Sequence, residues 1–466
     1  MTDKGSSRRS FLKLAATSTA AATLVPSAFA AGRPHVLETE PLRPVSPNDK
    51  IRIGTIGMGI ISYHDTAAAL ANPGIEFVAA ADLYDGRLAH VKEVYGDDIF
   101  TTKDYREILA RPDIDAVIIS VPDHWHTPIA VAALEAGKHV YLEKPMVHKV
   151  EEGQSIIDAQ KRTGKVLQVG SQFGSSVVFG KAKELFESGA IGNLNMIEAV
   201  YNRHSSLGAW QYTIPLDAST ETIDWDTFLG SAPNRPFDAK RFFQWRGYWD
   251  YGTGVAGDLY VHLFTGIHRA ISSKGPNEIY STGGVRYWKD GRDAPDLMMG
   301  LFAYPETPQH PEFTLSLQTN FEDGSGGGES FRFIGDEGAM TIEGGGITLS
   351  RQPMREPSER EVIEGYNSVY TFTKEMQEKL REQYRKTHAA VVPPELDQTV
   401  EYTVPRGYDA RVDHFAVFFA GVREGKPILE DATFGLRAAA PPLLANESYR
   451  EKKPIRWDPE HMRVVA

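Results

Sequence analysis

Residues 50–62 read KIRIGTIGMGIIS, an apolar run that passes directly into a glycine-rich turn. The run Ile51–Ile56 has the composition of a buried parallel strand, and the residues after the glycines follow a helical pattern. Gly57 would permit a tight turn, Gly59 would let a phosphate group approach the backbone, and the small Ser62 stands at the third glycine position. Strand, glycine-rich turn and helix in this order indicate a dinucleotide-binding unit.

A carboxylate stands at the position where such a unit binds a ribose. Asp82 follows the second predicted strand, Phe77–Ala81, and would accept hydrogen bonds from a ribose 2′-hydroxyl. A 2′-phosphate would be repelled there, so NAD is favoured; Arg87 softens that repulsion, and NADP is the alternative. The residues predicted to bind the cofactor in this part are Gly57, Met58, Gly59, Ile60, Ile61 and Asp82.

Strands and helices alternate from residue 50 to residue 175. Alternation of this kind predicts an α/β Rossmann domain with a doubly wound parallel sheet. The predicted strands are Ile51–Ile56, Phe77–Ala81, Ala116–Val121, Val140–Leu142 and Val166–Val169.

Residues 176–466 have a different texture, because predicted strands follow one another without helices between them. This order predicts an α+β domain with a large open, mostly antiparallel sheet, which would bind substrate and form homo-oligomers. The predicted strands are Met196–Tyr201, Glu278–Val285, Thr314–Thr319, Phe331–Ile334 and Met340–Glu343. Residues 351–410 are irregular apart from a helix near Phe372–Lys386. Two C-terminal helices, Arg411–Arg423 and Ala432–Glu447, would pack back on the Rossmann domain.

The first thirty residues have the order of an export signal. Arg8 and Arg9 precede a short Ala/Thr/Leu-rich run, and Ala28-Phe29-Ala30 provides small residues for cleavage. Paired arginines favour the twin-arginine (Tat) route over a chance pair beside an anchor helix, and they predict a periplasmic or secreted protein. Residues 31–49 contain four prolines and are predicted to be an extended linker. No later run is long and apolar enough to predict a membrane span.

Composition excludes several classes of function. The net charge of −12 disfavours nucleic-acid binding, because an acidic chain is repelled by phosphate backbones. The chain has no cysteine, so disulfides and thiol nucleophiles are excluded. The histidines lack metal-ligand spacing, and no metal site is expected.

Two further segments are more specific. Residues 121–128 read VPDHWHTP after the third of these strands, and residues 137–145 read GKHVYLEKP around the next one. Together with the glycine-rich turn they resemble the Gfo/Idh/MocA family of sugar and inositol dehydrogenases, in which Glu-Lys-Pro is a distinctive element. The resemblance implies that Pro122, His126, Glu143 and Lys144 lie at the cofactor.

The resemblance also implies a catalytic set of Lys144, Asp258 and His262. His262 would take the proton of the substrate hydroxyl, Asp258 would orient or charge-tune the site, and Lys144 would stabilise the developing alkoxide. Spacing i, i+4 would place Asp258 and His262 on one helix face. The chain departs from the family at Tyr260 and Thr265, which could signal a changed substrate or reaction.

Aromatic residues gather between positions 242 and 251, with Arg246 among them. Aromatic faces and an arginine suit a sugar ring, so Arg246 and Trp249, with Gln172, are predicted substrate contacts beside Asp258 and His262. The equal alternative is that these aromatics pack a hinge between the domains.

The favoured function is NAD(P)-dependent oxidation or reduction of a hydroxyl or keto group of a sugar, inositol or glycoside. Export in folded form implies a tightly bound cofactor that is recycled in place. A second reading is redox-neutral glycoside cleavage through a transient keto intermediate; a third, a non-catalytic sugar-binding protein, does not need the set Lys144, Asp258 and His262.

Overall fold

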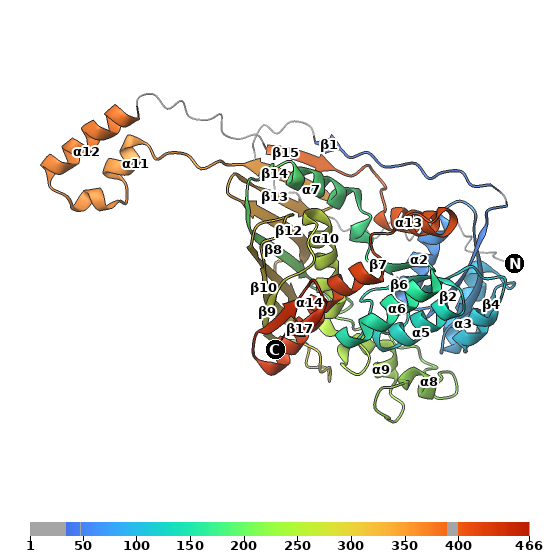
Figure 1. Ribbon diagram of the computed structural model, residues 1–466. Coiled ribbons are helices and arrows are strands. Elements are labelled where there is room, and N and C mark those ends of the chain that lie inside the picture. Colours follow the sequence, from blue (N-terminus) through green and yellow to red (C-terminus); the bar gives the residue numbers. More distant parts are fainter. Residues whose placement is uncertain (1–33, 47, 389–398, 466) are drawn as a thin grey trace, which may run out of the picture.

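The computed structural model describes residues 34–46, 48–388 and 399–465. The predicted export signal and its cleavage site after Ala30 lie outside the described residues. In Figure 1 the chain forms two sheets with helices between and around them, and both sheets contribute to one body.

The N-terminal sheet has six parallel strands in the order β4-β3-β2-β5-β6-β7. This confirms the predicted doubly wound sheet. The unpredicted edge strand β4 has only three residues, too few to show a pattern. The strands are β2 Ile51–Ile56, β3 Ile75–Ala81, β4 Phe100–Thr102, β5 Ala116–Ile119, β6 His139–Glu143 and β7 Leu167–Gly170. The helices are α2 Ile60–Leu70, α3 Asp85–Tyr95, α4 Tyr105–Ala110, α5 His126–Glu135 and α6 Gly153–Thr163.

The second sheet has eleven strands in the order β1-β15-β14-β13-β12-β8-β11-β10-β9-β16-β17. Two neighbouring pairs are parallel, β8 with β11 and β1 with β15, and the others are antiparallel. The predicted mostly antiparallel sheet is therefore confirmed. The strands are β1 His35–Val36, β8 Leu194–Asn202, β9 Glu278–Gly284, β10 Leu297–Tyr304, β11 Phe313–Asn320, β12 Gly328–Gly335, β13 Gly338–Glu343, β14 Gly346–Arg351, β15 Thr399–Thr403, β16 Ile455–Asp458 and β17 Arg463–Val465.

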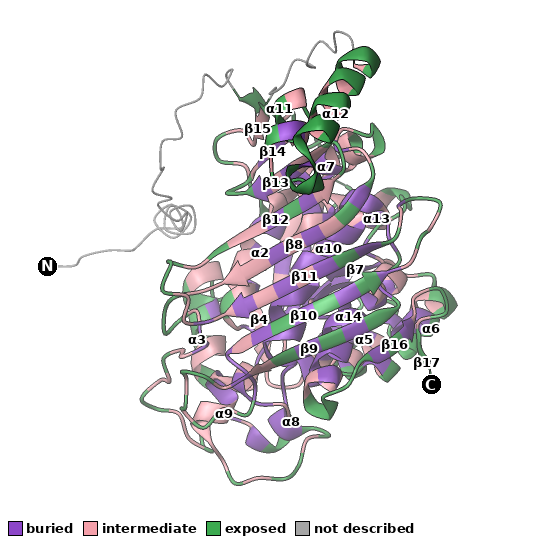
Figure 2. Ribbon diagram, turned by 90° about the vertical axis from the view of Figure 1, so that its left-hand side faces the viewer, coloured by how far each residue is buried: buried purple, intermediate pink, exposed green. Residues whose placement is uncertain are grey.

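One face of this sheet is covered by helices and the other is open. Helix α10 (Val261–Ile271) packs against α7 (Val177–Glu187) and α14 (Ala432–Glu451) on the covered face. Along β10, buried and exposed residues alternate, and Figure 2 shows this alternation across the open face. Strand β10 was not predicted, because Met299 and Leu301 on its exposed face are as apolar as its buried residues. That a second copy covers this open face stays a prediction.

The chain returns to the N-terminal sheet after completing most of the larger one. Helix α13 (Ala410–Glu424) contacts α2, and its Phe415, Phe418 and Phe419 share a buried cluster with Ile53 of β2. The ring of Phe415 stacks on Tyr141 of β6 with centroids 4.2 Å apart. The core of the Rossmann domain is therefore completed by residues more than 230 positions beyond its last strand.

Part of the proline-rich stretch pairs with the larger sheet. His35–Val36 form β1, which pairs in parallel with β15, and the Leu37 N–H donates to the Thr403 carbonyl at 2.8 Å. Residues 35–40 lack proline, so their N–H groups are available to a strand.

Residues 351–410 contain more regular structure than their irregular pattern predicts. The expected helix is present as α12 (Lys374–Thr387), preceded by α11 (Glu359–Glu364). Figure 1 shows this pair extending away from the body beside β13–β15. Among the described helices, none is long and apolar enough to cross a membrane.

Phe418→Ala should destabilise the Rossmann domain. Removal of a fully buried phenylalanine leaves a cavity in the core, and such changes lower the free energy of unfolding by about 3–5 kcal/mol. Urea denaturation measures the loss as a lower midpoint. The control is Phe372→Ala, since that ring is 43% exposed and its loss should change stability by about 0.5 kcal/mol or less. Equal midpoints for the two variants would contradict the docking of α13.

Candidate functional site

A cavity of about 380 Å³ lies at the carboxyl ends of β2, β3, β5 and β6, facing the larger sheet. Ligands bind at this edge of doubly wound sheets because the helix N-termini and the loops converge there. Thirteen of the residues predicted for the site line it: Gly57, Gly59, Ile60, Ile61, Asp82, Pro122, His126, Glu143, Lys144, Gln172, Arg246, Asp258 and His262.

The glycine-rich turn has the shape that a diphosphate requires. Gly57 has φ +87°, and a Cβ atom there would lie 2.6 Å from the Ser120 carbonyl oxygen, so only glycine fits. A Cβ on Gly59 would meet nothing within 4 Å, so the backbone faces open space. Gly59 is also the N-cap of α2, where no side chain caps the helix and the first turn has no acidic residue. The free N–H groups of this helix end therefore face the open space, which fits a bound diphosphate.

Asp82 is held at the far side of this turn. Its carboxylate accepts hydrogen bonds from the N–H groups of Met58 (2.7 Å) and Tyr84 (2.9 Å) and forms an ion pair with Arg87 at 3.3 Å. The Arg87 guanidinium lies over the rings of Phe242 and Phe243, in α9 (Ala239–Phe243). A carboxylate in this place suits a ribose hydroxyl, and the arginine beside it reduces the negative charge there.

Two residues predicted for the site do not line the cavity. The Met58 side chain is buried in the hydrophobic cluster under the sheet, and its backbone N–H serves Asp82. Trp249 lies elsewhere, because its indole N–H donates to the Asp293 carbonyl at 3.0 Å and Arg450 covers its ring. Of the neighbouring aromatics, Phe242, Phe243 and Trp245 line the cavity. The sequence could not show which of these rings turn inward.

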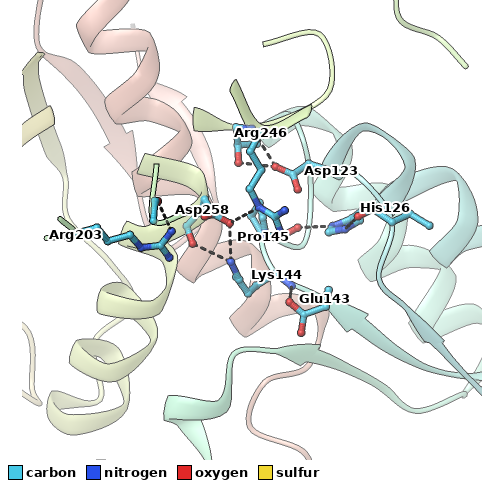
Figure 3. Close-up of polar contacts among 11 residues, drawn as sticks. Asp123, His126, Glu143, Lys144, Pro145, Arg203, Arg246 and Asp258 are labelled. Atoms are coloured by element: carbon cyan, nitrogen blue, oxygen red, sulfur yellow. Dashed lines mark hydrogen bonds and ion pairs between the residues drawn. The ribbon is translucent and has the colours of Figure 1, made fainter. Parts of the chain in front are cut away.

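An ion pair joins the two domains across the cavity (Figure 3). Lys144 is the first residue after β6. Its Nζ donates to Asp258 Oδ1 at 2.8 Å and to the Asp258 carbonyl at 3.0 Å. Arg246 Nε lies 3.2 Å from the same Oδ1. Burial by itself would raise the pKa of Asp258, but Lys144 and Arg246 together hold this pKa well below its usual range. Asp258 is therefore an ionised carboxylate that positions two cations.

The helix that carries Asp258 is not regular. Residues Ala256–Tyr260 form a π-helical turn directly before α10, and such turns are frequent at functional sites. Asp258 and His262 line the same cavity, but they share no hydrogen bond. The two residues that depart from the family pattern, Tyr260 and Thr265, do not line the cavity. The Tyr260 hydroxyl donates to the Met298 carbonyl, and the Thr265 hydroxyl donates to the Val261 carbonyl.

His262 is neutral in this environment. Burial and the nearby Lys144 charge hold its pKa well below the usual value. Its ring packs against Phe173 (centroids 5.7 Å apart) and Tyr201 (6.2 Å), and its Nδ1 has no hydrogen-bond partner in the described part of the chain. A neutral imidazole of this kind is able to accept a proton from a bound molecule.

Two other titratable groups line the cavity near Lys144. His126 is buried, with Nδ1 2.6 Å from the Pro145 carbonyl oxygen and Nε2 3.0 Å from that of Val121. Burial raises the pKa of Glu143 to about 7. Through its two contacts, the imidazole of His126 links the loops after β5 and β6.

Several cavity residues were missed by the sequence analysis: Asp65, Tyr201, Arg203, Glu329 and Arg411. Arg203 follows the predicted strand Met196–Tyr201, and a charged residue at a strand end was a usable signal. Arg411 begins α13, and no local pattern connects that helix with the cofactor turn. Within the described ranges, no group of three or more His, Asp or Glu residues is placed to hold a metal ion.

Comparison with known families agrees with this geometry. Residues 51–171 match the NAD-binding Rossmann domain of the GFO/IDH/MocA oxidoreductase family, and residues 193–277 match the C-terminal alpha/beta domain of the same family. An inositol 2-dehydrogenase of Salmonella paratyphi B is 32% identical over 157 residues, which are 33% of this chain and 46% of that protein. A glycosyl hydrolase family 109 protein of a Shewanella strain (W3-18-1) is 37% identical over 129 residues, 25% of this chain and 27% of that protein. The matches thus span less than half the length of these relatives.

Solved structures share most of the fold. A levoglucosan dehydrogenase in complex with NADH superposes with a TM-score of 0.60 over 87% of this chain and 99% of that one, at 19% identity. At this identity the likeness establishes the two-domain fold.

Asp82→Ala should weaken NADH binding by about tenfold or more, because the ribose loses a charged hydrogen-bond acceptor. NADPH binding should fall less, since the substitution also removes a charge that repels the 2′-phosphate while Arg87 remains. Fluorescence titration of both cofactors measures the two dissociation constants. Asp98→Ala, an exposed carboxylate beyond α3, is the control. Equal losses for both cofactors would remove Asp82 from the ribose site.

Proposed function

Since the chain carries the NAD-binding and C-terminal domains of the Gfo/Idh/MocA oxidoreductase family, we propose that it oxidises or reduces a hydroxyl or keto group of a sugar, inositol or glycoside with NAD. The observation that carries this proposal is the Lys144–Asp258 pair beside the neutral His262, in the same cavity as the glycine-rich turn. Acid–base groups and a dinucleotide turn in one cavity are the requirements of hydride transfer to and from a carbinol.

The residues that would hold the cofactor follow the cavity wall. The N–H groups at Gly59 would bind the diphosphate, Asp82 would bind the adenosine ribose, and Pro122, His126 and Glu143 would surround the nicotinamide end. When bound, NAD supplies a hydride acceptor or donor at its nicotinamide ring.

The protein side chains divide the remaining work. In oxidation, the imidazole of His262 takes the proton of the reacting hydroxyl, since it is neutral and His262 lines the cavity. The ammonium group of Lys144 donates a hydrogen bond to the same oxygen and stabilises its growing negative charge. Asp258 is a weak base because its pKa is depressed, so it acts as a positioning residue that orients Lys144.

A second candidate is redox-neutral glycoside cleavage. It is supported by the similarity of a quarter of this chain to a glycosyl hydrolase family 109 protein. In that chemistry a hydride leaves the sugar, the resulting keto group permits elimination of the aglycone, and the same hydride returns. The two candidates differ in one observable, since only the dehydrogenase accumulates a keto sugar with net change of the cofactor.

Lys144→Met and His262→Ala should each lower kcat by about 10²–10⁴-fold while cofactor binding persists, because each removes an acid–base or electrostatic contribution to the transition state. Steady-state turnover of sugars and polyols, with NADH titration of each variant, measures both effects. Lys149→Met and His461→Ala are matched controls on exposed side chains. Near wild-type turnover of His262→Ala would assign the base to another group.

We also propose that the protein is exported by the twin-arginine route with its cofactor tightly bound. Support comes from Arg8-Arg9 and the Ala28-Phe29-Ala30 site in the sequence. Outside the cytoplasm a lost cofactor is not readily replaced, so retention would be needed for repeated turnover.

Mature protein taken from a periplasmic fraction should therefore begin at Ala31 and release NAD on denaturation. N-terminal sequencing and mass spectrometry of the released nucleotide test both statements on one sample. Arg8→Lys with Arg9→Lys should leave the protein in the cytoplasm. An exported form that retains Arg8-Arg9, or exported protein without nucleotide, would contradict the proposal.

A further inference from the structure

We propose that the substrate is an acidic sugar whose carboxylate binds the guanidinium of Arg203. Arg203 follows β8 of the larger sheet and lines the same cavity as Lys144 and His262. This inference rests on the proposed function, since it names the class of substrate for that site.

Arg203 lines the cavity without forming an ion pair within the described residues. Lys144, Arg246 and Arg203 provide three cations, and Asp258 is already paired with the first two of them. Arg203 has no carboxylate within 4.0 Å in the part of the chain that the structure describes. Glu329 also lines the cavity, but burial raises its pKa to about 7, so its negative charge at neutral pH is incomplete. A cation in a cavity that forms no ion pair with a carboxylate suits an anionic ligand.

Arg203 is fixed in place before any ligand arrives. Its backbone N–H donates to the Asn320 carbonyl at 2.9 Å, and its carbonyl accepts from the Asp323 N–H at 3.1 Å. Its guanidinium carbon lies 5.5 Å from the ring centroids of both Tyr201 and Phe321. Because the side chain is held on two aromatic faces, little conformational entropy is lost when it binds a ligand.

Arg203 keeps hydrogen-bonding capacity beyond its contacts with Gly208 and Tyr201. A guanidinium has five N–H donors, and one nitrogen of this group donates to the Gly208 carbonyl at 2.8 Å. Figure 3 shows the guanidinium extending from the larger sheet toward the Asp258–Lys144 pair. A planar fork with free parallel N–H groups matches the two oxygens of a carboxylate.

The position of Arg203 relative to the reacting groups suits one sugar molecule. A single aromatic ring, that of Tyr201, contacts both Arg203, which lies over it, and His262, whose ring is at a T-shaped angle to it. Arg203 also contributes to the low pKa of Asp258, so these two groups are within electrostatic range. A sugar with its reacting hydroxyl at His262 and Lys144 would thus present a carboxylate on another carbon to Arg203.

A carboxylate fits better than a phosphate. A phosphate dianion needs more donors and more positive charge than one guanidinium supplies. The nearest other cations, Lys144 and Arg246, are committed to Asp258 at 2.8 Å and 3.2 Å.

The test uses the purified full-length protein with its cofactor and three forms of one sugar. D-glucuronate, its methyl ester and glucose 6-phosphate are compared, and the galactose series is a second set. Binding is measured by calorimetry and turnover by net NADH formation. We expect the free acid to bind about 10- to 100-fold more tightly than its ester in at least one series, the range of a charge-assisted bidentate contact.

Variants assign this preference to Arg203. Arg203→Gln should reduce the ratio of acid to ester affinity to near one, and Arg203→Lys should restore part of it. Arg332→Gln is the matched control, because Arg332 is an exposed β12 residue paired with Glu198, and it should keep the full ratio.

The outcomes separate this inference from the proposed function. Equal affinity for acid and ester, a preference for the phosphate, or a ratio unchanged in Arg203→Gln would overturn the inference. Tight, Arg203-dependent binding of the acid without NADH formation would support the inference and count against the dehydrogenase. Turnover of neutral sugars alone would support the dehydrogenase and overturn the inference.

Discussion

The Lys144–Asp258 ion pair is the interaction on which the site depends. Each side chain is about nine-tenths buried, so each charge needs a counter-charge: Asp258 provides it for Lys144, and Lys144 and Arg246 provide it for Asp258. Removal of one partner of such a pair typically costs about 3–5 kcal/mol, because an uncompensated charge stays buried. The pair joins the end of β6 to the π-helical turn before α10, and so it also fixes the Rossmann domain relative to the larger sheet.

The same pair sets the protonation states around it. The positive charge of Lys144 helps to keep Asp258 ionised, and together with burial it keeps His262 neutral. Two groups four residues apart therefore have opposite roles, one as a charged positioning group and one as a proton acceptor. With Asp258 shared between Lys144 and Arg246, the positive charge of Arg203 is left for a ligand.

The wall of the site is built by segments that are far apart in the chain. Strand β7, which leads into the loop with Gln172 and Phe173, is held by α13 and by the segment between α13 and α14. The Val169 N–H donates to the Glu430 carbonyl at 2.9 Å, and His414 Nε2 lies 2.9 Å from the Val169 carbonyl oxygen. A Cβ at Gly174 would overlap the buried Glu430 carboxyl, so this loop requires glycine there. The Rossmann core and one wall of the cavity are thus completed by residues that follow most strands of the larger sheet in the sequence.

The sequence by itself determined the parts that depend on neighbours along the chain. The strand Ile51–Ile56, the turn at Gly57 and the helix after it follow from backbone sterics and the hydrophobic pattern. The sequence also predicted that the first sheet is parallel and the second mostly antiparallel. The sequence, with its resemblance to a known family, also named thirteen residues of the cavity, and the tertiary structure alone decided the others. It brought Arg203 and Arg411 to the site, turned Trp249 away from it, and interrupted the α-helical spacing of Asp258 and His262 with a π-helical turn. Most of these outcomes depend on contacts between residues tens to hundreds of positions apart, and such packing leaves no periodic signal in a local stretch of sequence.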